Sequence, residues 1–295
     1  MNKNIIKIRK YVIGCANFGQ RYGLIEKKLK FKEFKEIFKL SIDKNLMYFD
    51  TAADYGNSEE LLGNIIKNQK NRVKIITKLP KKMYSKNFDT EMENQVLKSI
   101  KRLKVKSLYA LHIHEPNMLL NKDKFKIYNC FMKLKKKKLI KNIGVSVYTV
   151  EELKKILKKF KIDIVQIPIN LLDHRFTKNR FLKEIKKKVK EIHARSIFLK
   201  GLLLKNEISR PKYFNKWPIF KKLDRFFNEQ KISRLSTCIS FAFSFDEIDR
   251  VIIGVSSKDQ FNKILKVKKR VKNLPTLPKL NVVDKNLLIP KYWKI

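Results

Sequence analysis

Short β-rich apolar runs alternate with longer amphipathic segments along almost the whole chain, and this alternation limits the possible folds more than any other feature. Val, Ile, Tyr, Phe and Leu dominate the short runs. Alternation of this kind is typical of βαβ units built around a parallel sheet. The runs predicted as strands are residues 11–14, 47–50, 73–78, 108–114, 142–147, 164–167, 196–199 and 250–254.

Each predicted strand is followed by a segment with apolar residues at helical spacing. After the first strand, Phe34, Ile37 and Phe38 recur on one face of a helix. Thr149, with Glu152 three residues later, has the pattern of a capping box that begins the helix after the fifth strand. The predicted helices cover residues 32–44, 57 or 58 onward, 89–103, 124–138, 149 onward, 180–193, 234–243 and 257–270.

Eight strand–helix pairs is the number found in a (β/α)8 barrel, so the sequence predicts an α/β fold of the TIM-barrel type. We expect a single domain over residues 1–295, with a tail from about residue 272 that packs against the barrel through Leu287, Leu288 and Trp293. An open doubly wound sheet would show the same alternation. However, no G-x-G-x-x-G follows the first strand, where a dinucleotide-binding fold of that kind carries it.

The formal net charge is +43, from 70 Lys and Arg against 27 Asp and Glu. Such a charge could attract nucleic acid or anionic lipid. The basic residues are nevertheless spread along the chain, and runs such as 135–138 and 186–188 fall inside amphipathic helical patterns, where a solvated face is expected. Because no nucleic-acid-binding motif is present, composition is the favoured origin of the charge, and nucleic-acid binding stays a secondary hypothesis.

Neither a signal peptide nor a membrane span is predicted. The basic segment 1–10 is not followed by a continuous apolar run, and no run approaches the roughly 18 to 20 apolar residues that span a bilayer. Cys15, Cys130 and Cys238 are far apart and lack metal-ligand spacing, so buried free thiols and no metal site are expected. The absence of a signal peptide and of a span predicts a cytoplasmic protein. We expect a monomer or a weak oligomer.

Polar residues gather where three neighbouring predicted strands end. Asp50 ends the second strand and Tyr55 follows in the loop above it. Lys78 ends the third strand, and His112 and His114 lie at the end of the fourth. In a (β/α)8 barrel the carboxyl ends of the strands carry the reacting groups, so we expect these side chains to converge.

An Asp, a Tyr, a Lys and a His in one place suit carbonyl reduction. A nearby ammonium stabilises a phenolate, so Lys78 would ease proton release from Tyr55, and Asp50 would balance the buried charge of Lys78. A histidine beside the carbonyl oxygen would donate a hydrogen bond as negative charge develops there. For that role His114 is preferred, and His112 is expected to be a packed inner residue.

Residues 50–63, with the pattern D-T-A-x-x-Y-G-x-S-E, together with 76–80 and His114-Glu-Pro, closely resemble the aldo-keto reductase family. The resemblance continues through the later blocks, which look most like a bacterial branch found in sugar and surface-polysaccharide gene sets. It implies hydride transfer from NAD(P)H, with NADPH preferred over NADH, to a small carbonyl substrate that is sugar-derived in that branch. It also implies a catalytic tetrad of Asp50, Tyr55, Lys78 and His114.

The same resemblance suggests where the cofactor binds. Ser146 and Gln166 would hold the nicotinamide carboxamide, Phe198 would lie against the ring, and Asn17 would line the mouth after the first strand. After the eighth strand a helix begins, and its backbone amides can receive a phosphate, although the same serines would also serve as an ordinary helix cap. The expected ligands there are Gly254, Ser256, Ser257, Lys258 and Gln260.

Besides nucleic-acid binding, a further alternative function stays open at this stage. The barrel could bind its cofactor without significant turnover and act as a redox-responsive scaffold or regulatory protein. The complete tetrad favours the enzyme.

Overall fold

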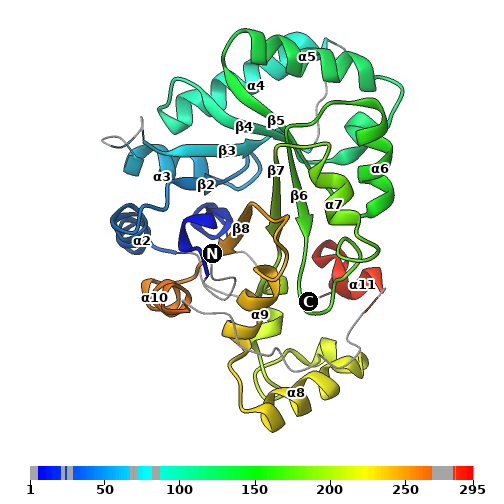
Figure 1. The fold of residues 1–295 in the computed structure, drawn as a ribbon. Helices are drawn as coiled ribbons and strands as arrows, with labels where there is room; N and C mark the ends of the chain where they lie inside the picture. The colour runs from blue at the N-terminus through cyan, green and yellow to red at the C-terminus, as the bar shows by residue number, and fades with distance from the viewer. Residues whose placement is uncertain are drawn as a thin grey trace.

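In the computed structural model, eight parallel strands close into a barrel in sequential order, with β1 paired to β8 (Figure 1). The predicted (β/α)8 barrel is therefore confirmed. The structure describes residues 6–20, 24, 29–66, 69, 72–81, 87–267, 282 and 284–294. The strands are β1 (Tyr11–Gly14), β2 (Tyr48–Asp50), β3 (Lys74–Lys78), β4 (Leu108–Ile113), β5 (Ile140–Ser146), β6 (Ile164–Pro168), β7 (Glu191–Arg195) and β8 (Arg250–Gly254).

The connecting helices lie outside the strands, while α8 lies at the bottom of the view in Figure 1, away from most of the barrel. The α-helices are α1 (Ala16–Gly19), α2 (Phe31–Asp43), α3 (Ser58–Ile65), α4 (Phe88–Leu103), α5 (Lys124–Lys136), α6 (Val150–Lys159), α7 (Phe181–Lys186), α8 (Ile219–Gln230), α9 (Arg234–Ala242), α10 (Lys258–Lys266) and α11 (Lys285–Leu288). The 3-10 helices are η1 (Ile8–Lys10), η3 (Pro116–Leu119), η4 (Leu199–Leu204), η5 (Lys212–Lys216) and η6 (Pro290–Tyr292).

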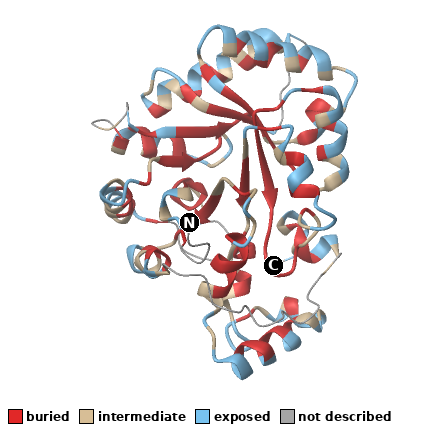
Figure 2. Ribbon diagram, in the orientation of Figure 1, coloured by how far each residue is buried: buried red, intermediate tan, exposed pale blue. Residues whose placement is uncertain are grey.

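Apolar side chains form two layers, as the alternation of side chains along each strand requires. The larger layer lies between the strands and the helices, which bury one face and expose the other (Figure 2). The smaller layer fills the barrel interior and consists of Val12, Tyr48, Ile76, Ala110, Ile164 and Ile252. The strands are therefore covered on both sides, which is why they read as short apolar runs in the sequence.

Several helix boundaries follow the predicted caps. The Thr149 hydroxyl accepts a hydrogen bond from the Glu152 amide at 3.1 Å, and the Glu152 carboxylate accepts one from the Thr149 amide at 3.0 Å. The predicted capping box of α6 is thus confirmed. Ser257 caps α10 by accepting from the amide of Gln260 at 3.0 Å.

The position predicted for the seventh strand is wrong. The strand begins at Glu191, whereas residues 196–199 form the turn into η4, in which Ser196 and Leu199 have φ of 58° and 45°. Positive φ at these residues is incompatible with an extended strand. The helix predicted over 180–193 correspondingly ends at Lys186.

Other differences are smaller. Helix α8 lies between residues 199 and 234, where no helix was predicted. Strand β5 begins at Ile140, two residues before its predicted start. Helix α10 ends at Lys266, and residues 268–270 of the predicted helix lie outside the described residues.

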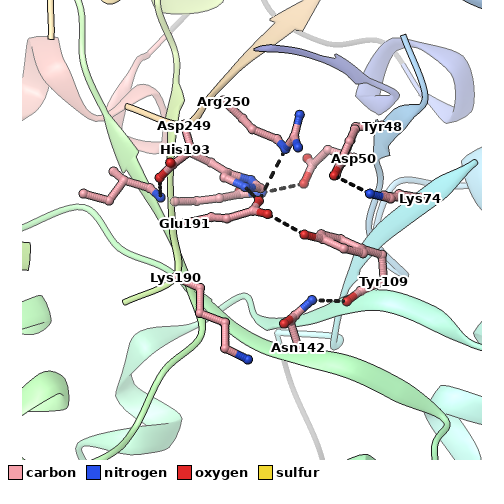
Figure 3. A network of polar contacts seen from close by, with 12 residues as sticks. Tyr48, Asp50, Lys74, Tyr109, Asn142, Lys190, Glu191, His193, Asp249 and Arg250 are labelled. Carbon is pink, nitrogen blue, oxygen red and sulfur yellow. Dashed lines mark hydrogen bonds and ion pairs between the residues drawn. The ribbon is translucent and has the colours of Figure 1, made fainter. Parts of the chain in front are cut away.

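A polar cluster, which we call the basal network, lies where β2, β3, β4, β7 and β8 begin (Figure 3). Glu191 bonds the Tyr109 hydroxyl, the His193 ring at 2.7 Å and Arg250 at 3.3 Å. The other members are Tyr48 and Lys74, with the Lys74 ammonium donating to the Tyr48 hydroxyl at 2.8 Å. This network occupies the end of the barrel opposite the carboxyl ends of the strands.

The C-terminal segment is packed where it is described. Leu287 and Leu288 are buried, and the Trp293 ring centroid lies 4.8 Å from that of Phe214. The three cysteines are also buried. Among the helices within the described ranges, none is long and apolar enough to cross a membrane.

Candidate active site

A cavity of about 150 Å³ opens at the carboxyl ends of the strands. It is lined by Asp50, Tyr55, Lys78 and His114, so the structure brings the four predicted catalytic residues together. The last residues of six strands contribute to its wall: Gly14, Asp50, Lys78, Ser146, Arg195 and Gly254.

Asp50 is held by two side chains from neighbouring parts of the barrel. Its Oδ2 lies 2.6 Å from the Lys78 ammonium, and its Oδ1 accepts from Gln166 Nε2 at 2.5 Å. Lys78 also donates to the carbonyl of Thr51 at 2.7 Å. All three side chains are buried, so the charge on Lys78 and the charge on Asp50 compensate each other away from water.

The loop that carries Tyr55 is fixed by close packing against α1. Gly56 has φ of +55°, a conformation that glycine adopts without steric cost. At Gly19 a Cβ atom would lie only 1.7 Å from the carbonyl oxygen of Tyr55. Both glycines are therefore needed for the close contact between α1 and the loop, and this contact fixes the position of Tyr55 beyond the strand ends.

The remaining residues of the Asp50–Gly63 motif anchor the same loop. Ser58 donates to the Cys15 carbonyl at 2.9 Å and accepts from Thr51 at 3.0 Å. Glu59 is buried and accepts from the Thr77 hydroxyl at 2.6 Å and from Arg102 Nε at 2.7 Å. The motif thus specifies a loop that is tied to β1, β3 and α4.

The electrostatics of Tyr55 differ from the prediction. The Lys78 ammonium lies 5.1 Å from the centroid of the Tyr55 ring, but it is already paired with Asp50. Burial raises the pKa of the Tyr55 phenol above its usual 10.0, the Asp50 charge raises it further, and Arg195 lowers it. The phenol is therefore protonated at neutral pH, as a proton donor must be.

His114 faces Tyr55 edge-on, with ring centroids 5.9 Å apart and an interplanar angle of 85°. Its Nδ1 lies 3.7 Å from an Asp54 carboxylate oxygen. Burial lowers the pKa of His114 below 6.5, although Asp54 partly opposes this. The imidazole is accordingly neutral at pH 7 and can donate a single hydrogen bond into the cavity.

His112 does not reach the cavity. Its ring is fully buried inside the barrel, and neither ring nitrogen has a hydrogen-bond partner among the described residues. A Cβ atom on Gly144 of the neighbouring strand would lie 2.0 Å from the His112 ring, so the glycine leaves room for the imidazole. The location agrees with the expected packed inner residue.

Five of the eight residues predicted to bind the cofactor line this cavity: Ser146, Gln166, Phe198, Gly254 and Gln260. Gln166 Oε1 and Asn17 Oδ1 are buried acceptors without a hydrogen-bond partner among the described residues, and both side chains line the cavity. A carboxamide offers an N–H₂ donor that such an acceptor requires. The residues present therefore fit a nicotinamide group.

The other three predicted cofactor residues lie at the start of α10, outside the cavity wall. Ser256 donates from its amide and its hydroxyl to Gln260 Oε1 at 2.7 and 2.8 Å. Ser257 caps the helix, and the Lys258 ammonium lies 3.6 Å from Glu36. In this arrangement the serines act as cap residues, with the helix N-terminus beside the cavity.

Sequence reasoning assigned no role to Tyr148, Arg195 or Lys200, which also line the cavity. The Arg195 guanidinium carbon lies 4.2 Å from the centroid of the Tyr148 ring. Arg195 is the last residue of β7, so a correct position for that strand would have identified it by the rule that placed Asp50 and Lys78. Tyr148 lies two residues beyond β5 and carried no comparable signal.

Comparison with known proteins gives one family and one fold. A profile of the Aldo/keto reductase family matches residues 10–275. The holo form of the aldo-keto reductase AKR11C1 from Bacillus halodurans superimposes with a TM-score of 0.72 and 18% identity, over 88% of this chain and 86% of that chain. A structure of the thermostable aldo-keto reductase Tm1743 with the inhibitor epalrestat superimposes with a TM-score of 0.68 and 18% identity. The match covers 88% of this chain and 89% of that chain.

A search of curated proteins gives no match. Within the described part of the chain, no group of three or more His, Cys, Asp or Glu residues could hold a metal ion.

Proposed function

Because the chain belongs to the aldo/keto reductase family, whose members are oxidoreductases acting on carbonyl groups, we propose that it reduces an aldehyde or ketone with a proton from Tyr55. NADPH, rather than NADH, is the proposed hydride source. The observation that carries this proposal is that Tyr55, Lys78 and His114 share one cavity. The Lys78 ammonium lies 5.1 Å from the centroid of the Tyr55 ring, and the centroid of the His114 ring lies 5.9 Å from it.

In this proposal Tyr55 and His114 bind the carbonyl oxygen together. The neutral imidazole donates a hydrogen bond that orients the carbonyl and stabilises negative charge as it develops on the oxygen. The protonated phenol then transfers its proton to that oxygen. Lys78 faces the Tyr55 ring and stabilises the phenolate that remains, while Asp50 holds the Lys78 ammonium in place.

The cofactor would be held by groups from β6, from α1, from the turn after β7 and from the start of α10. Gln166 Oε1 and Asn17 Oδ1 accept from the carboxamide, Phe198 packs against the ring, and the N-terminus of α10 receives a phosphate. When bound, the reduced nicotinamide supplies the hydride. Gln166 also bonds Asp50, so cofactor binding and the charge of the Asp50–Lys78 pair are coupled through one amide.

The substrate is proposed to be a small carbonyl compound, and the resemblance to sugar-modifying relatives favours a sugar-derived one. We further propose that residues 1–295 act as one domain, since the cavity wall draws on strands from β1 to β8.

The test is a fluorescence titration with NADPH and with NADH, followed by a screen of aldehydes and ketones that monitors oxidation of the cofactor. The expected result is saturable binding, tighter for NADPH, and turnover of at least one carbonyl compound. Gln166→Leu removes the group that accepts a hydrogen bond from the carboxamide, so it should weaken the binding of both cofactors about tenfold. Absence of cofactor binding, or binding with no turnover of any carbonyl compound, would contradict the proposal.

A further inference from the structure

We propose that the turns leading from α4, α5, α6 and α7 into the next strands form a surface that binds the phosphate backbone of a nucleic-acid duplex. The surface lies at the end of the barrel opposite the cavity, so the inference goes beyond the proposed function and does not depend on it. It follows from where the fold gathers exposed lysines, from how few carboxylates compensate them, and from which other residues these turns contain.

The fold brings to one end of the barrel lysines that are dispersed in the sequence. In a closed barrel of parallel strands, each of these helices ends at the side where the next strand begins. The lysine runs 135–138 and 186–188 extend past the last residues of α5 and α7, Lys136 and Lys186, and so reach this side. We call the following exposed residues the basal lysine surface: Lys104, Lys106, Lys137, Lys138, Lys161, Lys187, Lys188 and Lys190.

The basal lysine surface spans consecutive units of the barrel. Residues 104–107 follow α4, residues 137–139 follow α5, residues 160–163 follow α6, and residues 187–190 follow α7. The strands into which these turns lead, β4 to β7, are neighbours in the barrel (Figure 1). The lysines of the four turns therefore lie side by side around one part of the rim.

The opposite end of the same units lacks this excess of positive charge. The turns from β4 to α5, from β5 to α6 and from β6 to α7 contain these charged residues: Glu115, Lys122, Asp123, Asp173, Arg175, Lys178 and Arg180. Positive and negative charges are thus nearly balanced there. In the basal turns the acidic residue is Asp163, which is buried and bonded to Lys135 and Lys190. A lysine content set by composition alone would load both ends alike, so it does not account for this asymmetry.

Most of the basal lysine surface has no carboxylate partner among the described residues. Lys137 pairs with Glu93 at 2.7 Å and Lys190 with Asp163 at 2.9 Å, whereas Lys104 donates to the uncharged amide of Asn64 at 2.6 Å. A lysine in the last turn of a helix stabilises the helix dipole, but this effect falls off beyond that turn. The lysines that lie past the helix ends are therefore available to an external anion.

The residue types in these turns favour nucleic acid over a membrane or a protein. Lysine binds phosphate as a point charge, and phosphate contacts give binding that does not depend on sequence. Membrane surfaces also require exposed apolar side chains, and protein interfaces are depleted in lysine. The large hydrophobic residues exposed in the described chain lie outside these turns: Phe31, Leu97, Phe125, Met132, Ile208 and Tyr292.

The same turns favour a duplex over a single strand. Single strands bind largely by stacking their bases on exposed aromatic side chains. The aromatic residue of the basal turns is Phe160, which is buried. The surface therefore offers contacts to the backbone, which a duplex presents on its outside.

The binding test measures the fluorescence anisotropy of labelled duplexes of about 20 base pairs, one of DNA and one of RNA, in about 100 mM sodium chloride. We expect a Kd of about 1 to 100 μM for at least one duplex, rising steeply with added salt. The duplex that binds more tightly identifies the nucleic acid. An absence of binding to both duplexes would overturn the inference.

The variant that tests the surface combines Lys106→Gln, Lys138→Gln, Lys161→Gln and Lys188→Gln, with one change in each turn. A lysine that contacts a phosphate contributes about one to the slope of log Kd against log salt concentration. The combined variant should therefore bind about tenfold or more weakly in about 100 mM sodium chloride, and its slope should be lower by about 3. Circular dichroism should match the wild type, because all four side chains are exposed.

The matched control removes the same charge from another part of the molecule. It combines Lys212→Gln, Lys221→Gln, Lys222→Gln and Lys231→Gln, all exposed and located on or beside α8. Its affinity should stay within about twofold of the wild type, because salt screens charges that do not contact the duplex. An equal loss of affinity in the two variants would show that the overall charge attracts the duplex, and the inference would be wrong.

The membrane alternative has its own measurement, which is sedimentation with vesicles of phosphatidylcholine and phosphatidylserine. If vesicle binding is lost in the basal variant but duplex binding is the same in both variants, an anionic membrane is the partner and the inference fails. None of these measurements uses a carbonyl substrate. A failure here leaves the proposed function standing, and a failed carbonyl screen leaves this inference standing.

Discussion

At the scale of single residues, the neighbours of each titrating group in the cavity fix its protonation state. Burial and Asp50 keep the Tyr55 phenol protonated, because both raise its pKa. Burial keeps His114 neutral by lowering its pKa, even though Asp54 lies nearby. The proposed proton donor therefore stays protonated, without the net lowering of the Tyr55 pKa that an isolated ammonium would cause.

These states predict a flat pH profile for carbonyl reduction. Tyr55 loses its proton only above pH 10, and His114 gains one only below pH 6.5, so kcat/KM should be constant from about pH 7 to pH 9. The measurement is initial rate against pH at saturating cofactor. A decline centred between pH 7 and pH 9 in the wild type would show that the phenol is more acidic than the structure implies.

The sequence located the tetrad because each member follows a strand end whose position was predicted correctly. It could not give the bond from Gln166 to Asp50, since that contact joins strands far apart in the chain. It did predict the pairing of Asp50 with Lys78, but not that burial and the Asp50 charge together raise the pKa of Tyr55. The pKa of a group in the cavity depends on which charges lie near it, and those distances exist only in the folded protein.

At the scale of secondary-structure elements, the seventh strand shows where periodicity misleads. Phe181, Ile185, Val189 and Ile192 recur at helical spacing, so the helix was predicted to run into the strand. In β7 the residues on the inner face are Glu191, His193 and Arg195, which gives no apolar run. Residues that face the barrel interior near either end of a strand are often polar, so a short strand of this kind has no apolar run by which to predict it.

The pair of β4 and β5 provides a stability test. Gly144→Ala places a methyl group against the His112 ring, so it should lower the free energy of unfolding by about 1 to 3 kcal/mol. Urea unfolding measures this. Gly254→Ala is the control, because its Cβ would meet nothing within 4 Å. The double variant with His112→Ala should recover part of the loss, and a fully additive effect would contradict direct contact.

The basal network predicts acid sensitivity. Burial raises the pKa of Glu191, but its polar neighbours outweigh this effect. The pKa falls from 4.5 to about 2 because of hydrogen bonds from His193 and Tyr109 and the charge of Arg250. A lowered pKa contributes stability that is present above pH 4.5 and is lost as the pH falls towards 2. The free energy of unfolding of the wild type should therefore exceed that of Glu191→Gln by about 1 to 2 kcal/mol near neutral pH, because partial exposure screens the interactions of Glu191. The difference should shrink below pH 4.5.

Unfolding free energies of both proteins between pH 7 and pH 3 check this. The control is Glu229→Gln, an exposed residue at the end of α8, which should differ little from wild type at any pH. A gap between wild type and Glu191→Gln that does not change with pH would assign the effect to packing instead of charge.

At the scale of the whole molecule, the barrel and its closed order follow from the number of strand–helix units, which the sequence contains in full. The charge of +43 does not determine the fold, but it acts on its stability. Like charges spread over a compact surface repel one another, and dissolved salt screens that repulsion.

Raising sodium chloride from about 20 mM to about 300 mM should accordingly raise Tm by several degrees. Differential scanning calorimetry at pH 7.5 measures the shift. Substitution of several exposed lysines by glutamine should reduce the dependence on salt. A Tm that falls or stays constant with added chloride would mean that local ion pairs outweigh the overall repulsion.

The central claim is that Tyr55 gives the proton in the reductive step. The most direct measurement is a single-turnover reaction, in which the NADPH complex is mixed with the best carbonyl substrate and loss of the reduced cofactor is followed. Tyr55→Phe should slow this step by about 10² to 10⁴-fold while NADPH affinity stays within about twofold. Tyr128→Phe, which removes a phenol outside the cavity, should react like the wild type. A Tyr55→Phe rate within about threefold of wild type, with the cofactor fully bound, would contradict the claim.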